Sequence, residues 1–272
     1  MLLKNKKCSN CEGYYDPTLN ECPACHKTNE LYEQRRIPDS IMFFHPAAQI
    51  GLFLAGFAYI GMLISEIVAA LFLKSLVDGL LADVLIAFFA YLLMLGALLT
   101  ICFTSRRQTF IKKFSRPFDY LFGLAYAAGI FLVGYIISLI TGLFYNDPNT
   151  NQSIAESMIL NYPIFALILV IVLGPVCEEL TYRVGLYSFL RRINKVLAIV
   201  VTTIIFAFIH FDFTSENIIA ELWSLPSYIS CGLILAIAYE HRGPACSITA
   251  HMVYNAGAAL LVVLGSIYGP KA

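Results

Sequence analysis

Long apolar runs separated by short polar segments make up most of the chain after position 46. A run of about 20 apolar residues is the length that a helix needs to cross the hydrocarbon core of a bilayer. Seven runs are predicted to span the membrane: 47–73, 84–104, 118–145, 159–190, 195–211, 218–239 and 245–268. The run at 159–190 is unusually long and contains Gly174-Pro175, so it is either one tilted or kinked helix or two pieces that raise the count to eight.

Composition supports the same class. The chain is 59% hydrophobic and 13% charged, whereas roughly a quarter of the residues of a soluble domain are charged. A soluble core cannot hide that much apolar surface. The predicted fold is therefore an all-α polytopic membrane protein with a small polar head, and the polar first residues are not expected to form a cleavable signal peptide.

The basic residues predict the orientation. With a cytoplasmic N-terminus, all but two of the 18 Lys and Arg residues fall on the cytoplasmic side, the exceptions being Lys74 and Lys271. The loops 146–157 and 212–217 carry acidic residues and no basic ones. The positive-inside rule thus places the N-terminus inside, and seven spans place the C-terminus outside a membrane that we expect to be a bacterial plasma membrane. A zero formal net charge argues against a nucleic-acid partner.

Four of the eight cysteines lie in the polar head as two C-x-x-C pairs, Cys8/Cys11 and Cys22/Cys25, ten residues apart. Two such knuckles can close tetrahedrally on one ion, so the head is predicted to be a zinc ribbon with a structural zinc. Gly13 follows the first pair, where a knuckle needs conformational freedom. The alternative, a disulfide or redox pair, is disfavoured because the cytoplasm keeps thiols reduced.

The predicted domain organisation has four parts. A zinc ribbon occupies 1–28 and a linker with an interfacial end occupies 29–46. N-terminal transmembrane helices follow at 47–158, and the candidate catalytic helices lie at 159–268.

The apolar runs contain polar residues that a membrane segment normally excludes, and such residues are functional candidates. On a helix Glu178 and Glu179 point about 100° apart, while Glu179 and Arg183 are spaced i, i+4 and can pair. That pairing leaves Glu178 free. A purely structural ion pair beside an interfacial glutamate is the alternative.

Depth along the helices brings two histidines and an asparagine toward Glu178. Counted from a turn near 191–194 at ~1.5 Å per residue, Glu178 lies ~20 Å deep and His210 ~25 Å deep on the neighbouring antiparallel span. His251 and Asn255 share one face of the last span, ~10–17 Å from its cytoplasmic start. All four are predicted to line one cavity that opens to the cytoplasm.

Three motifs carry a resemblance to a known family: Glu178-Glu179-x-x-x-Arg183, Phe206-x-x-x-His210 and His251-x-x-x-Asn255. In this order on successive spans they resemble the CPBP (Abi) family of intramembrane proteases. That family includes CAAX prenyl endopeptidases and bacterial proteins linked to bacteriocin processing and self-immunity. The resemblance covers about 159–268, and each motif alone is weak.

The resemblance implies an endopeptidase that cleaves a peptide or protein substrate, lipidated substrates included. Glu178 and His210 would activate water, and His251 and Asn255 would stabilise the oxyanion. A second layer of residues would hold the catalytic side chains in place: Glu179, Arg183 and Phe206. The ribbon lies outside the family's common core and is expected to contact a protein partner or substrate.

Two alternatives remain open. One Glu and two His could also bind a catalytic zinc with an open fourth position. The metal-free mechanism is favoured because a zinc site would need a separate base. A non-catalytic immunity or binding protein on the same fold is the other alternative, with a small transporter a third possibility; the complete set of site residues favours the enzyme.

Overall fold

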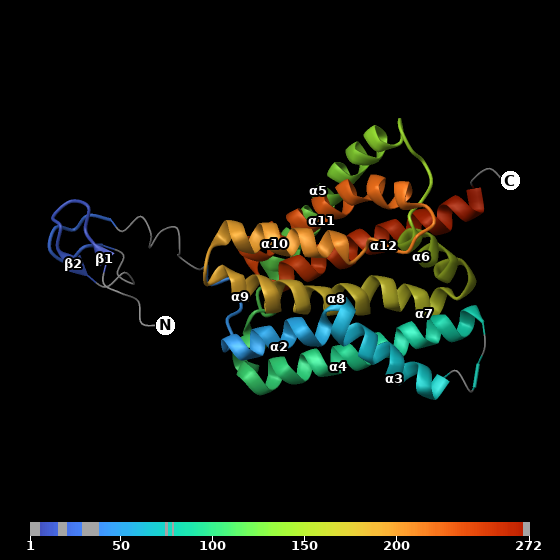
Figure 1. Ribbon diagram of the computed structural model, residues 1–272, viewed down its shortest axis with the longest axis horizontal. Helices are drawn as coiled ribbons and strands as arrows, with labels where there is room; N and C mark the ends of the chain where they lie inside the picture. Colours follow the sequence, from blue (N-terminus) through green and yellow to red (C-terminus); the bar gives the residue numbers. More distant parts are fainter. Residues whose placement is uncertain (1–5, 16–20, 29–37, 74–75, 78, 269–272) are drawn as a thin grey trace.

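The computed structural model describes residues 6–15, 21–28, 38–73, 76–77 and 79–268. It confirms the all-α membrane class with a small cysteine-bearing head (Figure 1). Within the predicted linker, residues 29–37 lie outside the described residues, as do Lys74 and Lys271.

The head is built from two very short strands and two turns. Strand β1 (Lys6–Lys7) pairs antiparallel with β2 (Tyr14–Tyr15), with Lys6 opposite Tyr15. An isolated bridge joins Glu21 to Thr28 in the second half. Tyr15 is buried against the cysteines, so this unit has a small core of its own.

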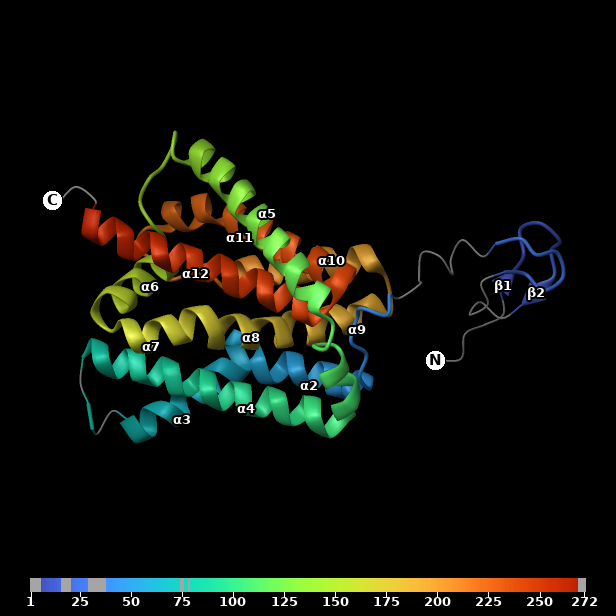
Figure 2. The same cartoon turned by 180° about the vertical axis from the view of Figure 1, so that it is seen from behind.

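The helical body begins at Pro46, and most of its helices run along one long axis (Figures 1 and 2). Its α-helices are α2 (Pro46–Gly56), α3 (Leu63–Leu73), α4 (Leu80–Lys112), α5 (Pro117–Thr141), α6 (Thr150–Asn161), α7 (Pro163–Ile168), α8 (Gly174–Glu178), α9 (Ser188–Arg191), α10 (Lys195–Phe208), α11 (Ile218–Arg242) and α12 (Pro244–Tyr268). Three π-helical stretches are η1 (Ala58–Met62), η2 (Leu169–Leu173) and η3 (Glu179–Tyr187).

Local sequence explains where several helices start. Proline occupies the first turn of α2, α5 and α7, where its missing N–H removes no helical hydrogen bond. Asn149, Asn194 and Asn217 cap α6, α10 and α11 by accepting hydrogen bonds from backbone N–H groups of the first turn. Gly243, with φ of 85°, separates α11 from α12 in a conformation that favours glycine.

Five helices are long and apolar enough to cross a membrane: α4, α5, the continuous segment Pro163–Arg191, α11 and α12. A sixth span results if Pro46–Gly56 and Ile60–Leu73, which are bent by 60° at Phe57, count as one. The sequence predicted seven. The difference is α10, whose 14 residues extend only ~21 Å, short of a hydrocarbon core of ~30 Å.

The segment Pro163–Arg191 is a single run and does not add an eighth span. It passes from α7 through η2, α8 and η3 to α9, and Pro175 is accommodated in the first turn of α8. It is the most buried of the five long spans. The run therefore forms the centre of the body, with α2, α4, α10, α11 and α12 packed around it.

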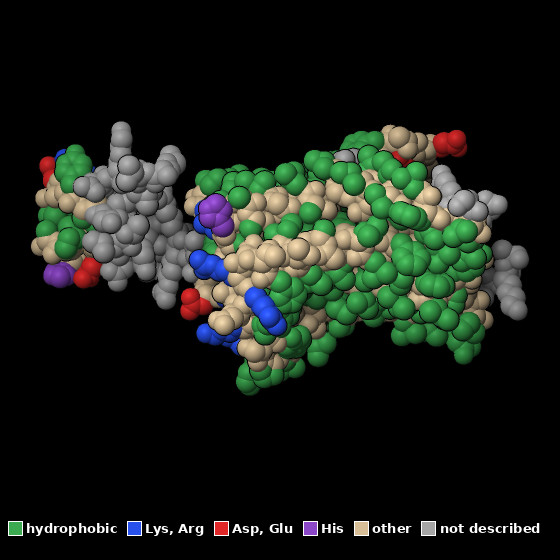
Figure 3. Space-filling view, turned by 90° about the horizontal axis from the view of Figure 1, so that it is seen from below, with side chains coloured by type: hydrophobic (Ala, Val, Ile, Leu, Met, Phe, Trp, Pro, Cys, Tyr) green, Lys and Arg blue, Asp and Glu red, His purple; other side chains and the backbone are tan. Residues whose placement is uncertain are grey.

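The surface of the body is apolar along its length and basic at one end. Figure 3 shows hydrophobic side chains over most of the visible face, with Lys and Arg gathered at one end. Large apolar side chains such as Leu71, Ile164 and Leu132 are more than 60% exposed. An exposed apolar surface of this extent is covered by lipid, so the chain is an integral membrane protein.

Candidate active site

The two adjacent glutamates lie where α8 passes into η3. Glu178 ends α8 and Glu179 begins the nine-residue π-helical stretch. π-Helical turns are rare and frequently occur at functional sites. The Glu178 side chain is 16% exposed and that of Glu179 is fully buried.

Glu179 is held by a buried network. Its Oε2 lies 3.5 Å from Nε of Arg183, the pairing that the i, i+4 spacing predicts. The Arg183 guanidinium is also fully buried, donates from Nη2 to the carbonyl of Gly232 (3.2 Å) and lies 4.6 Å from the centre of the Phe206 ring. The network holds the Glu179 carboxylate in contact with His251.

His251 lies between the two glutamates. Its Nδ1 is 3.3 Å from Oε1 of Glu179, and its Nε2 is 3.8 Å from Oε2 of Glu178. Because an ionised carboxylate only accepts hydrogen bonds, Nδ1 donates to Glu179 and Nε2 faces Glu178. Oε2 of Glu178 is buried without a hydrogen-bond partner.

The Phe206 ring packs against both histidines. Its centre lies 4.9 Å from the His210 ring and 5.7 Å from the His251 ring. One phenyl ring thus contacts both imidazoles as well as Arg183, which places the second motif against the first and third.

His210 follows α10 and is oriented by its own helix. Its Nδ1 donates to the carbonyl of Phe206 (2.8 Å), which leaves Nε2 as a hydrogen-bond acceptor. The ring stacks on Tyr228 of α11 at 4.6 Å. No ion pair within 4.0 Å joins His210 to Glu178 in the described part of the chain. Of the two imidazoles, His251 is the one next to Glu178.

Asn255 lies one turn beyond His251 on α12. Its Nδ2 donates to the carbonyl of Val170 in η2 (2.9 Å). The bond uses one of its two amide hydrogens.

Sequence reasoning missed Tyr91 of α4. A Cβ at Gly174 would lie 3.2 Å from the carbonyl oxygen of Leu169, 3.8 Å from Oε1 of Glu178 and 3.9 Å from Cε1 of Tyr91, so the Glu178 and Tyr91 side chains both lie next to Gly174. Tyr91 lies in an apolar run with no motif around it, and nothing in the sequence marks it.

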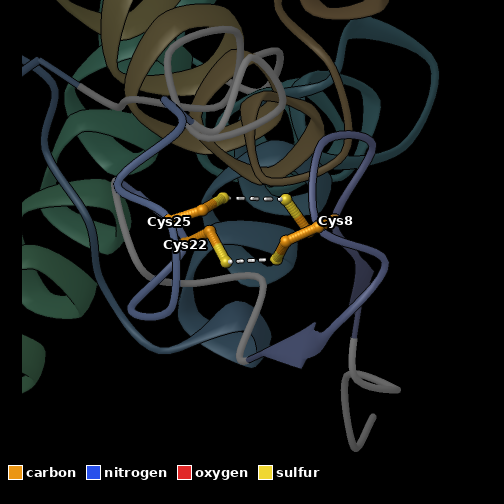
Figure 4. Close-up of side chains that lie close together, drawn as sticks. Cys8, Cys22 and Cys25 are labelled. Atoms are coloured by element: carbon orange, nitrogen blue, oxygen red, sulfur yellow. Dashed lines mark hydrogen bonds between the residues drawn. The ribbon is translucent and has the colours of Figure 1, made fainter.

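The four head cysteines form a compact ligand set (Figure 4). All four sulfurs lie within 4.8 Å of one another, with Cys8 to Cys25 and Cys11 to Cys22 both at 3.6 Å. Sulfurs bound tetrahedrally to zinc at ~2.3 Å are ~3.8 Å apart, so the spacing fits a metal ion. Among the described residues this is the one group of three or more such ligands close enough to share an ion.

The two knuckles have matching backbones. Each first cysteine accepts a hydrogen bond from the residue four positions later, Glu12 or His26, and both residues have positive φ (59° and 55°). The left-handed position therefore falls on Glu12, and the expectation that Gly13 provides it is wrong. Hydrogen bonds from Asn10 and from the backbone of Lys27 lower the pKa of Cys25 to about 6, which favours the metal-binding thiolate.

The fold and the glutamate–histidine cluster define an integral membrane protein in which a largely buried carboxylate lies next to an imidazole. Residues 160–257 match the family model described as type II CAAX prenyl endopeptidase Rce1-like. This segment is similar to that family, in agreement with the resemblance that the three motifs carry. The matched segment is somewhat more than a third of the 272 residues. It includes all three motifs, but neither the ribbon nor α2 to α5. No curated protein and no solved structure matches the chain.

Proposed function

We propose that the chain is an intramembrane endopeptidase in which Glu178 is the general base. The observation that carries the proposal is the Glu178 carboxylate itself, which is partly exposed, has one oxygen without a partner and lies beside an imidazole anchored by Glu179. A base in this position can take a proton from a bound water. The Rce1-like match supports peptide hydrolysis as the reaction.

In the proposed reaction the water oxygen bonds to the carbonyl carbon of the substrate while one water proton passes to Glu178. The carbonyl electron pair moves onto oxygen. When the tetrahedral intermediate collapses, the C–N bond breaks and Glu178 returns the proton to the leaving nitrogen.

The two histidines are suited to different roles. His210 donates from Nδ1 to Phe206, so its Nε2 lone pair can orient the water with Glu178. With a proton on each nitrogen, His251 bridges Glu179 and the reaction site and can donate from Nε2 to the oxyanion. Asn255 can donate its second amide hydrogen there.

A metal-free reaction is the form we propose. Glu178, His210 and His251 do not form a three-ligand set in the described structure, and Glu179, which a zinc mechanism would need as its base, is committed to Arg183. The head cysteines are proposed to hold a structural zinc, and the ribbon is proposed to contact a partner protein.

The proposed substrate is a peptide or protein segment at the cytoplasmic face, with prenylated C-terminal peptides as the first class to test because the matching family is described by them. We also propose that the N-terminus is cytoplasmic, that the C-terminus is outside and that the membrane is a bacterial plasma membrane. An outside C-terminus requires α10 and residues 209–217 together to carry the chain back across the membrane. The 3.7 Å contact of Lys195, at the start of α10, with Glu240, near the end of α11, supports this path. Processing of bacteriocin-type peptides is the second substrate class.

The test is cleavage of quenched peptides, prenylated ones included, by the full chain in liposomes. Glu178→Gln keeps the shape of the side chain but removes the base, so turnover should fall by about 10²–10⁴-fold. Glu156→Gln is the matched control, because Glu156 is a partly buried glutamate of α6 whose Oε1 accepts a hydrogen bond from Gln152 of the same helix. It should stay within a few-fold of the parent.

Equal turnover in the parent chain and Glu178→Gln would refute the assignment of the base. Loss of activity on chelation in a Cys8→Ser background, restored by zinc, would replace the metal-free mechanism. A folded parent chain that binds the peptides and cleaves none would favour a non-catalytic binding protein.

A further inference from the structure

A polar pocket lies at the basic end of the helical body, away from the glutamate–histidine cluster. Its volume is about 460 Å³. Four basic side chains line it together with two acidic ones: Lys112, Lys113, Arg116, Arg242, Asp39 and Asp119. Three uncharged polar residues complete the lining. The end of the body where basic side chains gather is visible in Figure 3.

Three distant segments meet at this pocket. The first is the segment before α2, which contains Asp39. The second is the turn between α4 and α5, flanked by Lys112 and Arg116, and the third is the end of α11 at Arg242. Non-helical dihedrals at Arg106 (φ −156°, ψ 68°) kink α4 and redirect its last residues. The pocket is therefore formed by tertiary structure and by no single sequence motif.

The positive charge of the pocket is only partly compensated. Nη1 of Arg242 lies 3.9 Å from Oδ1 of Asp119. Nε of Arg242 is buried without a hydrogen-bond partner. Lys113 donates to the backbone carbonyl of Asp39. No carboxylate of the described residues lies within 4.0 Å of Lys112 or Arg116.

The basic groups also disfavour one another. Burial and the neighbouring Arg116 lower the pKa of Lys113. A bound anion would relieve this repulsion and supply an acceptor for the unpaired Nε of Arg242.

Exposed apolar side chains lie on the same ends of α4 and α5 as the basic residues of the pocket. Ile111 on α4 and Phe118 and Leu121 on α5 are between 51% and 68% exposed, on helices that face lipid. The Arg242 guanidinium lies 4.0 Å from the centre of the Phe122 ring. A ligand with an anionic head and apolar chains would match both surfaces.

We propose that this pocket binds the phosphate of an anionic phospholipid head group, with the acyl chains along the exposed apolar side chains of α4 and α5. Lys112, Arg116 and Arg242 hold the phosphate. Because these residues belong to α4, α5 and α11, the bound lipid ties the three helix ends together. The proposal does not depend on the proposed peptidase activity.

The test is lipid binding to the purified full chain in a neutral detergent, measured by native mass spectrometry with phosphatidylglycerol and phosphatidylcholine. The parent should bind phosphatidylglycerol at least about tenfold more tightly. Each charge removed from the pocket should weaken binding about fivefold, so Arg116→Gln loses about fivefold and Lys112→Gln/Arg116→Gln about 25-fold. Arg107→Gln is the matched control, because Arg107, like Lys112, is an exposed basic residue of α4 but does not line the pocket. The affinity of this variant for phosphatidylglycerol should stay within twofold of the parent.

Equal weakening by Arg107→Gln and Arg116→Gln would overturn the proposal, because it would mean diffuse attraction to a basic surface. Displacement of the lipid by inorganic phosphate at similar concentrations would also overturn it and indicate a site for free phosphate. Melting curves without added lipid should coincide for parent and variants; if Arg116→Gln fails to fold, Lys112→Gln alone gives the same comparison.

Discussion

Substitution of Arg183 should show how strongly its interaction with Glu179 stabilises the folded protein. Arg183 and Glu179 are both fully buried and lie 3.5 Å apart. At an effective dielectric constant of about 20, two unit charges at this distance attract by about 5 kcal/mol. In Arg183→Met, Glu179 would lose its cationic partner and keep the hydrogen bond from His251, so the free energy of unfolding should fall by about 3–5 kcal/mol.

A double-mutant cycle measures the coupling itself. The four chains are the parent, Arg183→Met, Glu179→Gln and the double variant, unfolded reversibly in mixed micelles of increasing denaturing detergent. The coupling energy should be about 3 kcal/mol or more, because the double variant leaves no unpaired buried charge. Arg183→Lys should fall between parent and Arg183→Met, since it keeps the charge and loses the planar contact with Phe206.

A coupling energy below about 1 kcal/mol, as measured for exposed ion pairs, would refute the reasoning. It would mean that the two groups are neutral in the folded protein or that water reaches them. Peptide cleavage by the same variants separates stability from function. Arg183→Met should lose turnover even at temperatures where it stays folded, because His251 is positioned through Glu179.

Two further predictions concern packing and the head. A Cβ at Gly232 would lie 3.0 Å from Cδ1 of the buried Phe206 ring, so Gly232→Ala should lower the free energy of unfolding by about 1–3 kcal/mol and reduce cleavage. Gly265→Ala, which meets nothing within 4 Å, should cause neither effect in the same melting and cleavage assays. The purified chain should contain one zinc per molecule by elemental analysis, and Cys8→Ser should lose it. The melting curve of the helices should not change with the loss of zinc; a shift of several degrees would show that the ribbon stabilises the helical body.

The sequence predicted the features that depend on local chemistry. Membrane spans follow from the hydropathy of each segment, and the cysteine cluster follows from two C-x-x-C turns. The Glu179–Arg183 pair follows from helical spacing. Where the estimate of seven spans differs from the structure, the reason is again physical, since the apolar run at 195–211 is too short as a helix to cross on its own.

Only the tertiary structure decided which groups of the site meet. Depth arithmetic at ~1.5 Å per residue brought both histidines toward the level of Glu178 but could not say which one contacts it, and in the structure His251 Nε2 lies 3.8 Å from Glu178 Oε2. The stretches η2 and η3 depart from the 3.6-residue period of an α-helix, and helix packing sets the rotation of each helix about its axis. Tyr91 and the basic pocket come from segments far apart in the chain. Spacing along one helix is local and can be read from the sequence, whereas the contacts between helices depend on how whole surfaces pack.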